Sequence, residues 1–184
     1  MSYQVLDGAA ALKYVYGLGA GSSGDPYRLV YNRYSNALTE DGKIFSYSPV
    51  MSLANNGTAN YLIKTPASPK VTLYEFDVSS DNSPVFHTLY EDVIVSANGT
   101  LASAFNNNRQ SSTTAGTLIY TSPTITSTGT LLSADITTGG KLAGGVSLRE
   151  FRIIFKASAN YLVQLTNSSG NPANISLFLK WAET

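Results

Sequence analysis

The chain has 184 residues, and its twelve lysines and arginines balance its twelve aspartates and glutamates, so its formal net charge is zero. Without a basic field to collect phosphates, nucleic-acid binding is not expected to be its main role. The chain has no cysteine and one histidine, which excludes disulfides, thiolate zinc sites and metal sites built from two imidazoles. We therefore expect neither a metal nor a cofactor in one ordinary domain with a small appendage.

No apolar run approaches the roughly 20 residues that are needed to cross a bilayer. The first residues, MSYQVLDGAA, lack the basic start and the apolar core of a secretory signal. We therefore expect synthesis in a cytoplasm and no membrane partner.

Residues 1–58 are expected to form an N-terminal arm and a linker. Seven of the twelve tyrosines fall in residues 1–47, and tyrosine suits surfaces that are apolar on one side and hydrogen-bonded on the other. Residues 12–16 and 27–31 are β-prone and are joined by a glycine-rich stretch, which predicts a small hairpin or an extended arm. Residues 32–58 show no sustained periodicity and are predicted to be a linker with at most one short strand.

Residues 59–184 are predicted to form a β-sandwich domain. Apolar residues alternate along 174–181, and a period of two means that one strand face is buried. About eight such runs, separated by turn signals, favour an all-β, jelly-roll-like antiparallel sandwich. Residues 100–109 are expected to form a short helix or a strand-crossing loop. The other predicted strands are residues 61–64, 71–78, 85–95, 117–120, 130–136, 151–155 and 161–166.

One internal similarity relates residues 59–64, ANYLIK, to residues 159–164, ANYLVQ. A single match does not indicate a solenoid or a propeller, because those folds repeat at a fixed period. We interpret the match as two similar strand starts.

Residues 19–24, GAGSSG, match the glycine pattern of dinucleotide-binding loops. That chemistry requires a helix directly after the glycines, because the helix N–H groups hold the pyrophosphate. Here Asp25, Pro26 and then a β-prone run follow, so a flexible turn is the better interpretation.

The single histidine is a weak candidate for catalysis. On a strand, His87 would share one face with Val85 and Leu89. No Gly-x-Ser-x-Gly nucleophile elbow occurs in the chain. A histidine that is hydrogen-bonded at a sheet face or a subunit contact is the favoured interpretation.

Paired carboxylates give an equally weak signal. Glu75 and Asp77 would lie roughly 7 Å apart on one strand face, within the range for glycoside hydrolysis, but any such pair meets that spacing. A calcium site near Asp77, Asp81 and Asn82 would lack the glycine-centred loop of an EF-hand. We expect a protein that is not an enzyme, and keep a hydrolase using Glu75, Asp77 or His87 as a minor alternative.

A polar segment offers a different kind of site. Three consecutive asparagines and an arginine stand on a stretch that Leu101 and Phe105 tether. Such side chains either bond local backbone in an ordered inter-strand loop or reach a partner. The four residues are Asn106, Asn107, Asn108 and Arg109.

Several segments together form a recognisable pattern. They are residues 71–78, the stretch from Asn98-Gly99-Thr100 to Arg109, Pro123-Thr124, Gly129-Thr130-Leu131-Leu132, 160–163 and 175–181. Over about residues 59–182 the chain resembles the capsid decoration (cement) proteins of tailed bacteriophages and their jelly-roll virion relatives. Residues 5–8 and 19–27 resemble the N-terminal pieces of phage head-associated proteins, in which such an arm lies on the shell.

This resemblance implies a structural virion protein on the capsid surface, which binds the major capsid protein as a homotrimer or homodimer and has no catalytic role. An arm that orders on binding must recover the lost entropy over a large, partly apolar contact. The tyrosines that could supply this contact are Tyr3, Tyr14, Tyr16, Tyr27, Tyr31 and Tyr34.

The alternative is a receptor- or carbohydrate-binding β-sandwich of a phage tail or head fibre. Such sandwiches often present loops or aromatic faces to sugars. The candidate aromatic residues are Tyr74, Tyr90, Tyr120 and Trp181. Trp181 shares a strand face with Leu177 and Leu179, so it is predicted to lie in the core instead.

Overall fold

The computed structural model divides the chain into two compact units, residues 1–35 and residues 36–184. In the first unit, β1 (Ser2–Leu6) pairs antiparallel with β2 (Leu12–Tyr16), with Ser2 opposite Tyr16. The structure describes residues 2–6, 12–16, 36–82, 84–137 and 152–184.

The hairpin of the first unit has a different partner strand from the one predicted. The sequence pattern pairs residues 12–16 with residues 27–31, whereas the structure pairs β2 with β1. A connection through residues 7–11 is shorter than one through 17–26, and a shorter loop loses less entropy on closure. Residues 27–31 and the glycine pattern at 19–24 lie outside the described residues.

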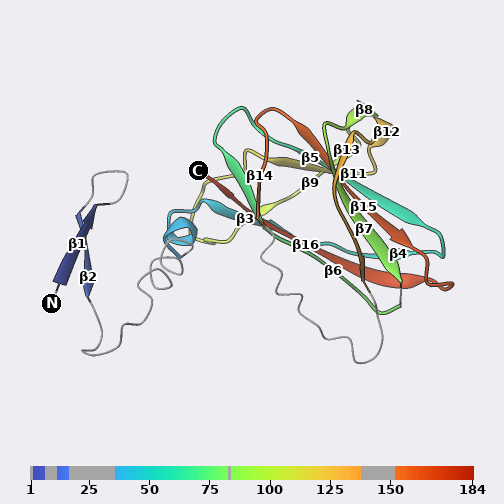
Figure 1. Ribbon diagram of the computed structural model, residues 1–184, viewed down its shortest axis with the longest axis horizontal. Helices are drawn as coiled ribbons and strands as arrows, with labels where there is room; N and C mark the ends of the chain where they lie inside the picture. Colours follow the sequence, from blue (N-terminus) through green and yellow to red (C-terminus); the bar gives the residue numbers. More distant parts are fainter. Residues whose placement is uncertain (1, 7–11, 17–35, 83, 138–151) are drawn as a thin grey trace. The chain divides into compact units, whose positions relative to one another are not determined.

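The second unit contains two six-stranded antiparallel sheets packed as a sandwich (Figure 1), and we name each sheet after its central strand. The β15 sheet has the order β13-β7-β15-β5-β11-β9, and the β16 sheet has the order β10-β3-β16-β6-β14, with β4 also paired to β16. The strands of the β15 sheet are β5 (Thr58–Lys64), β7 (Val85–Glu91), β9 (Thr100–Ala102), β11 (Leu118–Thr121), β13 (Thr130–Thr137) and β15 (Asn160–Asn167). Those of the β16 sheet are β3 (Ile44–Tyr47), β4 (Val50–Leu53), β6 (Val71–Ser80), β10 (Phe105–Asn106), β14 (Ile153–Ile154) and β16 (Ala173–Glu183).

The strand order confirms the predicted jelly roll. The chain alternates between the sheets, since β5, β7, β13 and β15 lie in one sheet while β6, β14 and β16 lie in the other. The resulting orders, β3-β16-β6-β14 and β5-β15-β7-β13, are those of an eight-stranded jelly roll with two Greek keys. The segment between β7 and β13 is an insertion into this plan.

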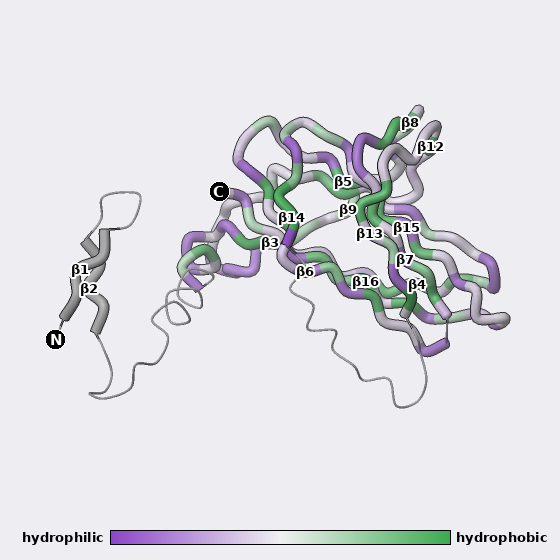
Figure 2. Tube along the Cα trace, viewed as in Figure 1, coloured by the Kyte–Doolittle hydropathy of each residue, from purple (hydrophilic) through white to green (hydrophobic). Residues whose placement is uncertain are grey.

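Apolar residues from both sheets fill the space between the layers, and hydrophobic residues gather along the strands of the sandwich (Figure 2). Trp181 is 2% exposed, as predicted, and its ring stacks on Phe45 at 6.1 Å between centroids. Phe155 stacks on Tyr161 at 4.0 Å. Stacked pairs of this kind add to the stabilisation that burial alone provides.

Residues 36–58 belong to the sandwich, and the boundary lies at residue 35 instead of near 58. A helical turn at residues 36–40 precedes β3, and both β3 and β4 pair with β16. All four residues of β3 are buried, because Leu38 of the helical turn packs with Ile44 on the other side of the strand. A strand that is covered on both faces shows no alternation of apolar and polar residues. The sequence pattern therefore predicted a linker for this stretch, and that prediction is wrong.

Two other segments refine the sequence prediction. The run at 85–95 is divided into β7 and β8 by Asp92, whose φ is 59°. Residues 100–109 do cross between the sheets, because β9 pairs with β11 and β10 pairs with β3. The described residues include no helix long and apolar enough to span a bilayer.

Candidate functional site

The asparagine segment is tied to backbone groups of its own chain. Asn106 is buried, and its Nδ2 donates hydrogen bonds to the carbonyls of Gly42 (2.7 Å) and Thr113 (3.0 Å). The Ser46 hydroxyl on β3 donates to Asn107 Oδ1 at 2.6 Å. These hydrogen bonds occupy amide groups that the sequence analysis had considered for contact with a partner.

Arg109 is the exposed end of this segment. Asn108 Nδ2 donates to the Glu40 carbonyl at 2.8 Å, whereas the Arg109 guanidinium lies over the exposed Phe105 ring, 5.9 Å from its centroid. The three asparagines therefore form an ordered inter-strand loop, and Arg109 with Phe105 is the part that faces solvent. The role of these residues in capsid contact stays a prediction.

The candidate tyrosines of the first unit are only partly described. Tyr3 lies opposite Val15, and Tyr14 lies opposite Gln4 in the hairpin register. Tyr16 lies at the end of the same ladder. Tyr27, Tyr31 and Tyr34 are outside the described residues.

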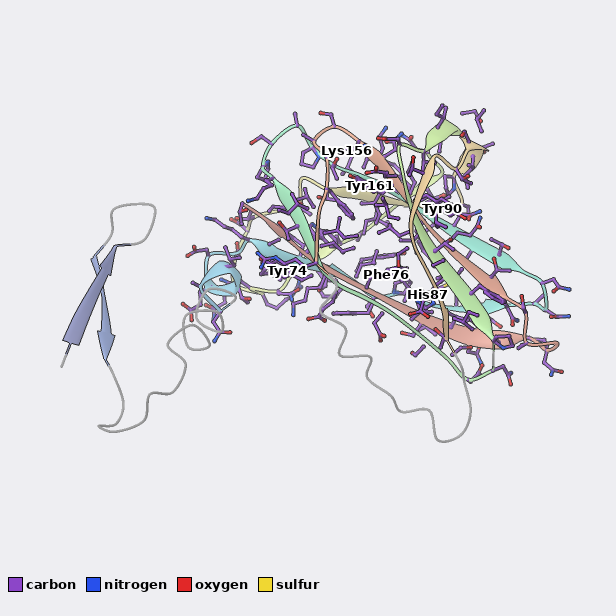
Figure 3. All side chains as sticks on the ribbon, in the orientation of Figure 1. Tyr74, Phe76, His87, Tyr90, Lys156 and Tyr161 are labelled. Carbon is purple, nitrogen blue, oxygen red and sulfur yellow. The ribbon has the colours of Figure 1, made fainter. Side chains whose placement is uncertain are left out.

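His87 lies on the inner face of β7, at the edge of the core. Its ring meets Phe76 edge-on, with centroids 5.4 Å apart (Figure 3). The nearest hydroxyl, that of Thr137, is 3.4 Å from Nδ1 and donates to the Val78 carbonyl at 3.0 Å. Burial lowers the pKa of His87 against the opposing charge effect of Asp135. The histidine is held as a neutral ring in a sheet, and its hydroxyl neighbour is already hydrogen-bonded to backbone.

The carboxylates of β6 lie on the outer face of the β16 sheet. The exposed Glu75 pairs with Lys180 on the neighbouring strand, with Nζ and Oε1 2.7 Å apart. Asp77 lies two residues further along the same exposed face. An exposed carboxylate with a lysine beside it is a solvated ion pair, and this geometry provides no cleft between two carboxyl groups.

Asp81 joins the end of β6 to the start of β16. Its two carboxylate oxygens accept hydrogen bonds from the backbone N–H and the side-chain amide of Asn174, both at 2.7 Å. These bonds lower the pKa of Asp81, and the bond from the Asn174 side chain has the largest effect. Asn82 donates to the Pro172 carbonyl at 2.8 Å. The described residues include no group of three acidic, histidine or cysteine side chains that could hold a metal ion.

The sequence reasoning missed a buried carboxylate. Glu183 is 7% exposed, and its Oε1 accepts hydrogen bonds from Thr117 N (2.9 Å) and Trp181 Nε1 (3.0 Å). Its Oε2 accepts one from Gly116 N (2.8 Å). Three N–H donors around one carboxylate make a structural bond between the end of β16 and the chain before β11. No spacing in the sequence indicates this arrangement.

A row of apolar side chains crosses the outer face of the β15 sheet. These residues alternate with core residues such as Tyr61 and Ile63, so they point away from the other sheet. Leu62 and Leu162, at the centre of the row, are fully buried, whereas Leu101 and Leu131 at its ends are 58% and 52% exposed. In register order the row is Leu101, Tyr120, Leu62, Leu162, Tyr90 and Leu131.

A two-stranded ribbon, which we call the strap, covers the centre of this row. It consists of β8 (Ile94–Ala97) paired with β12 (Thr124–Ser127). One strap strand follows β7 and the other follows β11, and these two strands flank the central pair β15 and β5. To pair with each other, β8 and β12 must cross the outer face between them. This crossing accounts for the complete burial of Leu62 and Leu162.

The two halves of the strap repeat each other about an approximate two-fold axis. Tyr90 recurs as Tyr120, and Gly99-Thr100-Leu101 recurs as Gly129-Thr130-Leu131. β9 pairs with β11 as β13 pairs with β7. The same axis relates the ANYL segments, because Leu62 lies opposite Leu162. A comparison of residues 89–104 with 119–134 would have revealed this repeat in the sequence.

The aromatic candidates separate into three environments. Trp181 is in the core. Tyr74 packs beside the small cluster around Leu38, under the Arg152 guanidinium at 5.2 Å. Tyr90 and Tyr120 are half-buried at equivalent places in the outer row of the β15 sheet.

The outward positions of β7 and β13 form a second exposed feature, which we call the β13 stripe. Residues that face the core, such as Leu89 and His87, lie opposite Ser133 and Asp135 on β13. The positions between them point outward and hold no charged residue. The stripe consists of Phe86, Tyr90, Leu131, Leu132, Ala134 and Ile136.

The contacts of His87, Glu75 and Asp81 are structural, and the exposed features of the described residues are apolar surfaces and an arginine loop. No family model matches the chain, and neither a curated protein nor a solved structure matches it.

Proposed function

We propose that the protein is a structural virion component that decorates a bacteriophage capsid by binding major capsid protein subunits. In this proposal it acts as a homo-oligomer on the capsid surface and catalyses no reaction. The observation that carries the proposal is the combination of a jelly-roll sandwich with a separate N-terminal unit. Jelly rolls serve in viral capsid and lectin domains, so the fold supports this role by analogy.

The chemistry of the described residues supports a non-catalytic role. The carboxylates of Glu75, Asp81 and Glu183 are engaged in an ion pair, hydrogen bonds to Asn174 and hydrogen bonds to buried N–H groups, respectively. His87 has a lowered pKa and packs against Phe76. Function then rests on surfaces, and the exposed large apolar side chains supply these.

Removing residues 1–35 should abolish binding to capsid shells that lack this protein and leave the sandwich folded. The boundary follows the division into two units, and every strand of both large sheets lies after it. Co-sedimentation with the shells measures binding, and circular dichroism with thermal unfolding checks the sandwich. The full chain should sediment with shells at a fixed stoichiometry. Undiminished binding of the shortened chain would remove the arm from the proposal, and no binding of the full chain would overturn it.

The paired tyrosines favour carbohydrate or receptor binding as the second candidate function. Tyr90 and Tyr120 hold equivalent, half-exposed places beside exposed leucines, and aromatic rings with one apolar face suit sugar rings. The double variant Tyr90→Ala/Tyr120→Ala should then lose binding on a glycan array by at least about ten-fold. Tyr74→Ala, on the other sheet, serves as the control. An array on which the full chain binds nothing would eliminate this candidate.

A further inference from the structure

The longest free strand edge of the two sheets, within the described part of the chain, belongs to β13. One edge of β13 pairs with β7, and no described strand pairs with the other edge. β13 has eight residues, whereas the edge strands β4, β9, β10 and β14 have four, three, two and two. β13 contains neither lysine nor proline, two residues that protect free edges. It does carry a β-bulge between Leu131 and Ser133 and the charged Asp135 on its inner side, and the Asp135 carboxylate accepts a hydrogen bond from the Ile136 N–H at 2.8 Å.

The β13 stripe adds an apolar surface along this edge. Leu131, Leu132 and Ile136 are 52%, 37% and 46% exposed, and Phe86 on β7 is 40% exposed. Together these four side chains expose roughly 300 Å² of apolar surface, which is as large as the main patch on a typical monomer. One side of a standard interface buries about 800 Å², of which somewhat more than half is apolar. In an edge-to-edge strand pair the outer sheet face still points to solvent, so only the side chains next to the edge contribute to that apolar share.

The sequence of β13 is self-complementary. Around Ala134, the order Leu132-Ser133-Ala134-Asp135-Ile136 places similar or compatible residues at equal distances on both sides. In an antiparallel pair of two such strands centred on Ala134, each Leu132 lies opposite Ile136 of the second copy. Each Asp135 lies opposite Ser133 of the second copy. The two carboxylates are therefore not directly opposed, which avoids the unfavourable contact of like charges.

We propose that β13 pairs with β13 of a second copy of this chain about a two-fold axis at Ala134. The pairing joins two β15 sheets into one continuous sheet and places the two stripes side by side on its outer face. A zero net charge removes long-range repulsion between the copies. The inference deepens the homo-oligomer of the proposed function by naming its interface and symmetry, and it can be tested on the free protein without a capsid.

A second copy fits this edge better than an unrelated strand does. An isologous contact requires one surface to complement itself. β13 meets this requirement because its side-chain order is nearly symmetric about Ala134 and because its single charged residue, Asp135, does not face the Asp135 of the second copy. The equivalent edge strand on the other side of the approximate two-fold, β9, is too short to form such a pair. Leu101 on β9 therefore supplies a matched control for residues on β13.

The first experiment measures the mass of the full chain by light scattering over a range of concentrations. We expect a species of twice the 19.6 kDa chain mass that dissociates on dilution. Ala134→Lys places two lysines against each other at the axis and should weaken the dimer at least about ten-fold. Leu101→Lys should leave it unchanged. A monomer or a trimer at every concentration, or an Ala134→Lys variant that dimerises as well as the parent, overturns the proposal.

The second experiment uses the absence of cysteine from the chain. Directly opposed residues of an antiparallel pair have Cα atoms about 4.5 to 5.5 Å apart, within the range for a disulfide. Ala134→Cys should therefore form a covalent dimer under mild oxidation, with loss of two thiol protons and two electrons to the added oxidant. Leu101→Cys should stay monomeric on a non-reducing gel. Equal cross-linking of the two variants, or no cross-linking of Ala134→Cys, contradicts the two-fold contact. A dimer that forms but does not bind shells would overturn only the proposed function.

Discussion

Replacing Glu183 with alanine is expected to lower the free energy of unfolding by about 3–5 kcal/mol, because two buried N–H groups and a third that is partly buried lose a charged acceptor. The donors are the backbone N–H groups of Gly116 and Thr117 and the indole N–H of Trp181. Urea unfolding measures the change, and the fluorescence of Trp181, the single tryptophan of the chain, reports it directly.

Glu75→Ala is the matched control for this prediction. Its carboxylate makes an equally short ion pair with Lys180 (2.7 Å), but on an exposed sheet face. Exposed ion pairs contribute at most about 1 kcal/mol, so Glu75→Ala should change stability little. A similar loss in both variants would contradict the structural role of the buried carboxylate at Glu183.

Gly99→Ala and Gly129→Ala should each destabilise the sandwich by about 2–4 kcal/mol, since a side chain there adds both backbone strain and overlap. Gly99 and Gly129 have φ angles of 88° and 71°. A Cβ at Gly99 would overlap the carbonyl oxygen of Thr121, and one at Gly129 would overlap that of Glu91. Thermal and urea unfolding of the two variants measure the loss.

Gly170→Ala separates the two contributions. Gly170 has a φ of 83°, but a Cβ there meets no atom within 4 Å. Only the strain of the left-handed conformation remains, which amounts to about 1 kcal/mol. Equal losses at Gly99, Gly129 and Gly170 would show that close approach of the strap glycines to the neighbouring backbone is unimportant.

The sandwich could be predicted because most of its strands are buried on one face. Ile175, Leu177, Leu179 and Trp181 point inward and alternate with outward residues, so the pattern is visible in the sequence. β3 could not be predicted in the same way, because all its residues are buried and it has only four of them. Its burial depends on Leu38 and Ala182, and the sequence does not show that these residues meet.

The candidate site residues also differ in how far local sequence could predict their environment. The composition and the weak motifs around His87 and Glu75 argued against catalysis, and the structure places these two side chains against Phe76 and Lys180. The asparagine segment offered two interpretations, and only the positions of Gly42, Thr113 and Glu40 distinguish them. The β13 stripe depends on which strand lies at the edge of a sheet, and strand order is not encoded in local alternation.

The central position of the last two strands has a consequence for how the protein folds as it is made. β15 lies between β5 and β7, and β16 lies between β6 and the pair β3 and β4. Every one of these neighbours is synthesised earlier, so until residues 160–183 have left the ribosome both sheets lack the strand that joins their halves. Contacts between residues so far apart in the sequence form slowly, and unpaired strands that wait for a partner are prone to aggregate. Until then each sheet is in two unjoined parts, β5-β11-β9 and β7-β13 in one and β3-β10 and β6-β14 in the other. A translational stop before β15 would therefore release a product that cannot close either sheet.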